Sequence, residues 1–61
     1  MNKLYIALAL LKMLSERNEI NSKYVANELN ISIRTAQRYL LELSILPFVT
    51  HNPERKSYSL V

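Results

Sequence analysis

The stretch YVANELNISIRTAQRYLLEL (residues Tyr24–Leu43) is the most informative about the fold. It contains two helical patterns separated by a short polar turn. The first pattern carries apolar residues at helical spacing and predicts a short helix over about 22–29. Asn21 or Ser22 can cap the start of this helix by accepting backbone N–H bonds. Asn30 suits its end, because Asn adopts the left-handed conformation more readily than most other residues.

The second pattern predicts a helix over about 33–45, with Ser32 as its N-terminal cap. Pro47 disfavours helical geometry at the residue before it, so the helix is expected to end by Ile45. Apolar residues at spacings of three and four mark one inner side. This inner side consists of Ala36, Tyr39, Leu40 and Leu43. Two short helices joined by the residues NIS predict a helix-turn-helix.

The C-terminal part changes to a period of two, which predicts a hairpin of two strands, a wing, over about 48–61. Asn52 and Pro53 are typical residues for its turn. We expect one side of the hairpin to cover the helices, and His51 and Tyr58 to serve packing within it. The expected cross-strand pairs are His51 with Ser57, Thr50 with Tyr58, and Phe48 with Leu60.

The order helix, helix, turn, helix and hairpin resembles the winged helix-turn-helix DNA-binding domains of DeoR-type bacterial and phage transcription regulators. The residues that carry the likeness are Val25, Ala26, Leu29, Ile31, Ser32–Thr35 and Leu46–Val49. The resemblance implies one winged helix-turn-helix domain over 1–61, mainly α with a small C-terminal β-hairpin. It also implies that the helix over about 33–45 is the recognition helix.

Composition narrows the classes of function. The chain of 61 residues has a net charge of +3 and contains no Cys, no Asp and one His. The positive balance favours a polyanionic partner. The missing residue types leave little material for a nucleophilic triad, a metal cluster or an acid–base site, so we expect no enzyme, no metal and no cofactor. The apolar run Leu4–Leu11 is far shorter than the roughly 20 residues of a membrane span, so we expect a cytoplasmic protein without a membrane partner. No small-molecule ligand is evident from the sequence.

Polar residues gather at the start of the helix over about 33–45, away from its apolar side. When a helix enters the major groove, the side chains that read bases lie in its N-terminal half. Arg can bind guanine, Gln can bind adenine, and backbone N–H groups at a helix start can bind phosphate. The residues that we assign to double-stranded DNA are Ser32, Arg34, Thr35, Gln37 and Arg38. The alternative is that they form only the solvated side of a surface helix.

Three further basic side chains are candidates for contact with the phosphates of the DNA backbone. Lys23 lies near the start of the helix over about 22–29, which in such motifs crosses the backbone. Arg55 and Lys56 lie at the predicted hairpin tip, where charges can also serve to protect strand edges.

The predicted first helix, over about 3–17, carries more apolar residues than one small domain can cover. One stripe suffices for the core: Leu4, Ala7, Leu8, Leu11 and Leu14. A second stripe at the same spacing consists of Ile6, Leu10 and Met13. A domain of this size buries only about 60% of its unfolded surface, so we expect the second stripe to form a homodimer interface. The alternative is a broad buried face on a central helix.

The sequence therefore predicts a small transcription regulator that binds specific double-stranded DNA, with two recognition helices reading two half-sites. A winged-helix protein-interaction module is the main alternative, because fold alone does not fix function. An RNA-binding winged helix is the other. Loss of Arg34 and Arg38 separates the first alternative, since an interaction module tolerates it and a DNA-binding protein does not. A comparison of duplex DNA with single-stranded and duplex RNA separates the second.

Overall fold

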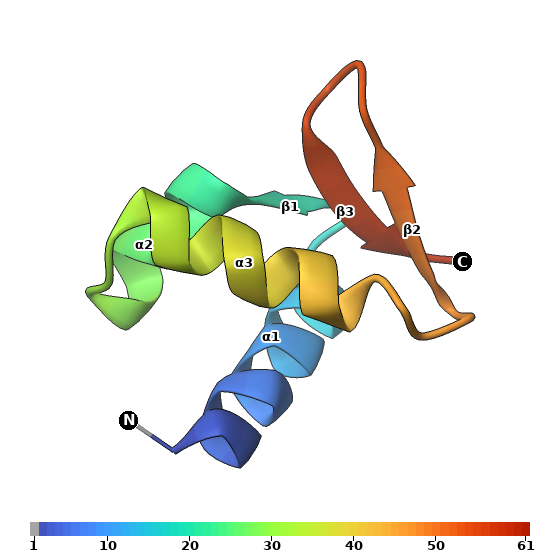
Figure 1. The fold of residues 1–61 in the computed structure, drawn as a ribbon. Helices are drawn as coiled ribbons and strands as arrows, with labels where there is room; N and C mark the ends of the chain where they lie inside the picture. The colour runs from blue at the N-terminus through green and yellow to red at the C-terminus, as the bar shows by residue number, and fades with distance from the viewer. Residues whose placement is uncertain (1) are drawn as a thin grey trace.

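A computed structural model describes residues 2–61, which form three helices and a small antiparallel sheet of three strands (Figure 1). The elements in chain order are α1 (Lys3–Glu16), β1 (Ile20–Asn21), α2 (Ser22–Leu29), α3 (Ile33–Leu43), β2 (Val49–Asn52) and β3 (Ser57–Leu60). In Figure 1, α2 and α3 lie above α1, β2 and β3 stand on the right, and β1 runs from α2 toward β3. The protein is mainly helical, as the sequence predicted.

Short polar side chains fix the ends of the helices. Asn21 Oδ1 accepts a 2.7 Å hydrogen bond from the Tyr24 backbone N–H and so begins α2. Ser32 Oγ accepts a 3.1 Å bond from the Thr35 N–H and begins α3 in the same way. Asn30 ends α2 in the left-handed conformation, with φ 56°. These predicted caps and the bounds of α2 are confirmed.

The C-terminal end of α3 differs slightly from the prediction, since the helix ends at Leu43 rather than near Ile45. The next residues tighten into a turn: Ile45 N donates to the Glu42 carbonyl and Leu46 N donates to the Leu43 carbonyl. Such bonds satisfy carbonyl groups that a helix end leaves without intrahelical partners. Ser44 and Ile45, which were expected in the helix, therefore belong to the turn before Pro47.

The core lies where α1, α2, α3 and the sheet meet. Its buried apolar members are Ile6, Leu10, Leu14, Ile20, Val25, Ala26, Ala36, Leu40, Leu43, Val49 and Tyr58. The inner side predicted for α3 is confirmed, because Ala36, Leu40 and Leu43 are buried and Tyr39 is half-buried.

The orientation of α1 differs from the prediction. Ile6 and Leu10 face the core, with 2% and 1% of their surface exposed, and Leu14, at 2%, is buried as expected. Leu4 and Leu8, which were expected inside, are 66% and 58% exposed. Both stripes are apolar and equally spaced, so their sequence does not indicate which one the rest of the molecule covers.

The predicted homodimer surface is therefore wrong in its residues. Ile6 and Leu10 belong to the core of their own chain, and Met13 is half-buried against that core. Side chains that already pack inside one chain are not available to a second copy.

The sheet has the order β1-β3-β2, with β1 a short strand that the sequence did not predict. The hairpin register is one residue away from the expected one, since His51 lies opposite Tyr58 and Val49 opposite Leu60. Asn52 sets this register: its Oδ1 accepts hydrogen bonds from the N–H groups of Glu54 and Arg55 at the turn. The register accordingly buries Val49 and leaves Phe48 46% exposed.

Within residues 2–61, no helix is both long enough and apolar enough to span a bilayer. The cytoplasmic location stays a prediction.

Candidate functional site

The outer face of α3 gathers the predicted group of polar residues. Arg34, Gln37 and Arg38 are exposed and Thr35 is half-buried, and together with Leu41 they line one shallow depression. The amphipathic pattern of α3 explains this arrangement, because burial of the opposite side turns these side chains outward. The structure thus brings together four of the predicted residues on one surface.

The side chains of Ser32 and Thr35 already form hydrogen bonds at the start of α3. Ser32 Oγ donates a 2.8 Å hydrogen bond to Thr35 Oγ1 while it accepts the bond from the Thr35 N–H. Arg38 lies near an aromatic ring, with its Cζ 5.5 Å from the ring centroid of Tyr39. Arg34 and Arg38 form no ion pair with the described part of the chain, so the face is positively charged.

Lys23 does not join this face. It lines a separate depression between α2 and the start of α3, together with Tyr24, Asn27 and Asn30 among others. The guanidinium of Arg17 lies over the Tyr24 ring, with its Cζ 4.3 Å from the ring centroid.

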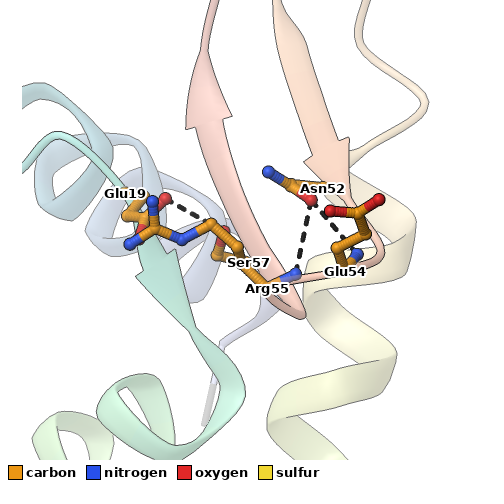
Figure 2. A network of polar contacts seen from close by, with 5 residues as sticks. All are labelled: Glu19, Asn52, Glu54, Arg55 and Ser57. Carbon is orange, nitrogen blue, oxygen red and sulfur yellow. Dashed lines mark hydrogen bonds and ion pairs between the residues drawn. The ribbon is translucent and has the colours of Figure 1, made fainter.

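Arg55 and Lys56 are neighbours in sequence but have different surroundings. Arg55 Nη2 lies 2.7 Å from Glu19 Oε1, so the Arg55 side chain joins the hairpin tip to the segment before β1 (Figure 2). Ser57 is buried and donates a 3.1 Å hydrogen bond from Oγ to Glu19 Oε2. Lys56 instead adopts a positive φ of 52° and lies at a different cavity.

That cavity is a slot of about 240 Å³ between α3 and the hairpin. We call it the α3–hairpin slot; the residues that line it are Ser22, Gln37, Leu41, His51, Lys56 and Tyr58. His51 and Tyr58 stack with ring centroids 4.5 Å apart and planes 12° apart. Burial raises the pKa of the Tyr58 hydroxyl above its ordinary value.

The sequence did not indicate this slot. With His51 placed opposite Ser57, the two rings were not expected to lie side by side. The period of two predicted the two strands of the hairpin. It could not indicate their register, because the register depends on the turn.

A second missed feature is an apolar face on the first two turns of α1. Leu4, Tyr5 and Leu8 are 66%, 59% and 58% exposed, and we call them the α1 apolar face. Figure 1 shows these turns extending below α3, away from the sheet. Lys3 beside this face forms an ion pair with Glu42 of α3 at 3.2 Å.

Among residues 2–61, no three His, Asp or Glu side chains gather where they could hold a metal ion.

Comparison with known proteins gives one informative relative. The chain is 38% identical over 63 aligned residues to a riboflavin kinase from Picrophilus torridus. The alignment covers 98% of this chain but only 28% of the relative, so the chain spans less than a third of that enzyme's length. No family model and no solved structure match the chain.

This relative corrects two expectations. A match to riboflavin kinase points to part of an enzyme, so the predicted function as a DNA-binding transcription regulator is wrong on this comparison. The expectation of no enzyme is contradicted by the same match, because the relative is an enzyme. Composition is a poor guide here, because a portion of an enzyme need not carry the residues of its reaction centre.

Proposed function

We propose that the chain works as a module of a riboflavin kinase and takes part in the phosphorylation of riboflavin as one portion of that enzyme. The observation that carries the proposal is the alignment, which uses 98% of this chain and 28% of the riboflavin kinase. Such a pattern fits a chain that corresponds to one folded module of a larger protein.

The fold proposed for this module is a winged helix. Three features support it: the pair α2 and α3 joined by a tight turn at Asn30, a single core shared by α1, α2 and α3, and a β2–β3 hairpin beside α3. Because one fold serves many functions, the winged helix by itself does not fix the role of the module.

The α1 apolar face is the proposed contact with the rest of the kinase. Three large apolar side chains, each more than half exposed, lie within two helical turns at Leu4, Tyr5 and Leu8. Clustered exposed apolar side chains mark surfaces that another protein part covers. The relative supplies such a neighbour, because most of its length lies outside the aligned portion.

A chimera tests this proposal. The aligned portion of the Picrophilus torridus kinase is replaced by this chain, and the rate of riboflavin phosphate formation is measured. We expect the chimera to retain activity and a Leu8→Glu variant to lose it, because a carboxylate is costly to bury in an apolar contact. Lys12→Glu is the matched control, since it adds a carboxylate at an exposed position of α1 outside the apolar face.

Two results count against the proposal. One is equal activity when an unrelated segment replaces the aligned portion, because the chain then contributes nothing specific. The other is a stable dimer of the isolated chain that Leu8→Glu dissociates while the chimera's activity stays unchanged. That result assigns the α1 apolar face to a second copy of the chain.

A further inference from the structure

We propose that the α3–hairpin slot binds riboflavin phosphate, with the flavin ring against the His51–Tyr58 stack and the phosphate at Lys56. This inference rests on the proposed function, because riboflavin phosphate is what a riboflavin kinase makes. It adds a ligand site within the module itself, and so a way for the module to respond to the product.

The aromatic wall of the slot suits a planar ring. Tyr58 is buried in the core, and the directly opposed His51 stacks on it with centroids 4.5 Å apart. The imidazole is therefore supported from behind, while His51 itself remains exposed. Aromatic rings prefer such stacked neighbours, and a supported ring loses little conformational freedom when a ligand arrives.

The opposite wall and the edges also match a flavin. Leu41, exposed on α3, gives the slot an apolar wall across from the rings. Gln37 and Ser22 line the slot with side chains that make no hydrogen bond to any other described residue. The flavin ring carries carbonyl and N–H groups along its edge, and a Gln amide can both donate to and accept from such groups.

Lys56 supplies the charge for the phosphate. It is exposed, forms no ion pair inside residues 2–61, and lies at the hairpin tip beside the slot. The slot volume of about 240 Å³ is slightly below the roughly 300 Å³ of the smallest common ligand pockets, which suits a ring but not a whole ligand. The chain of the ligand then extends to the mouth, where the ammonium group can bind the phosphate.

The test uses the 61-residue chain and the fluorescence anisotropy of riboflavin phosphate and of riboflavin. We expect the phosphorylated flavin to bind more tightly. Lys56→Asn should weaken its binding by about tenfold and leave riboflavin unchanged, because one charge-assisted bond is lost. Asn keeps the turn, since it tolerates a positive φ. His51→Ala should weaken both ligands, and His51→Phe should restore them.

Lys23→Asn is the matched control, because it removes the same charge away from the slot. Equal weakening by Lys23→Asn and Lys56→Asn overturns the site, as does the absence of any anisotropy change in the native chain. Displacement of the flavin by an equal concentration of adenosine or cytidine monophosphate overturns the flavin assignment. These measurements need no kinase activity, so a failed slot and a failed chimera are distinguishable.

Discussion

Glu19 contacts two residues of the hairpin at once, because its Oε1 lies 2.7 Å from Arg55 Nη2 and its Oε2 accepts a 3.1 Å hydrogen bond from Ser57 Oγ. The two contacts differ in environment, since Ser57 is buried while Arg55 is largely exposed. The carboxylate therefore ties the start of β3 to the segment before β1 more firmly than the ion pair alone could.

Replacement of Glu19 should separate the two contributions. Glu19→Ala leaves a buried hydroxyl without its acceptor and should lower the free energy of unfolding by about 1–3 kcal/mol. Glu19→Gln keeps an acceptor for Ser57 and should cost only about 0–1 kcal/mol, the usual value of an exposed ion pair. Urea unfolding measures both. Glu54→Ala, at the same hairpin tip, is the control, and an equal loss in Glu54→Ala and Glu19→Ala would contradict the role of Glu19.

The left-handed residue that ends α2 gives a second prediction. Asn30→Ala should destabilise the fold by about 1–2 kcal/mol, because a residue with a Cβ and no local polar group is disfavoured at φ 56°. Asn30→Gly should be neutral or stabilising at this position. Asn27→Ala, inside α2, should instead stabilise the helix slightly. Thermal unfolding followed by circular dichroism compares the three, and the same sign for Asn27→Ala and Asn30→Ala would refute the cap.

The orientation of α1 can be tested with one substitution at two sites. Leu10→Ala should cost about 2–5 kcal/mol, because it opens a cavity at a residue that is 1% exposed. Leu8→Ala should change stability by only about 0.5 kcal/mol in the isolated chain. Equal losses in urea unfolding would mean that α1 is rotated, with the stripe containing Leu8 inside.

The raised pKa of Tyr58 predicts a loss of stability in alkali. Below about pH 10 the hydroxyl is neutral in both states, so its contribution is fully present. As the pH rises toward the folded-state pKa, the unfolded chain loses this proton first, and the free energy of unfolding falls. Urea midpoints at about pH 9 and about pH 11 should show a smaller fall for Tyr58→Phe than for the native chain. Identical falls would show that other groups cause the whole effect.

The parts of the fold that the sequence predicted are those governed by neighbours along the chain. Asn21, Asn30 and Ser32 act within three or four residues, so the bounds of α2 and the start of α3 could be predicted. The outer face of α3 followed from its strong amphipathic pattern. These features need no knowledge of the rest of the molecule.

The remaining features depend on distant contacts. The rotation of α1 is set by what α3 and the sheet cover, and both of its stripes are apolar enough to be buried. The hairpin register depends on the turn after Asn52, and one residue of difference brings His51 to Tyr58 instead of Ser57. The α3–hairpin slot exists only in that register, so no pattern in the sequence alone could have indicated it.

The central place of β3 has a consequence for the order in which the molecule assembles. The helices α2 and α3 are neighbours along the chain, so they can dock early through contacts that close only a short loop. The sheet must wait for the last strand, because the bond between Glu19 and Ser57 joins residues 38 positions apart. A chain with its helices already paired therefore still lacks the wall formed by His51 and Tyr58. Whatever delays β3 also delays the formation of the α3–hairpin slot.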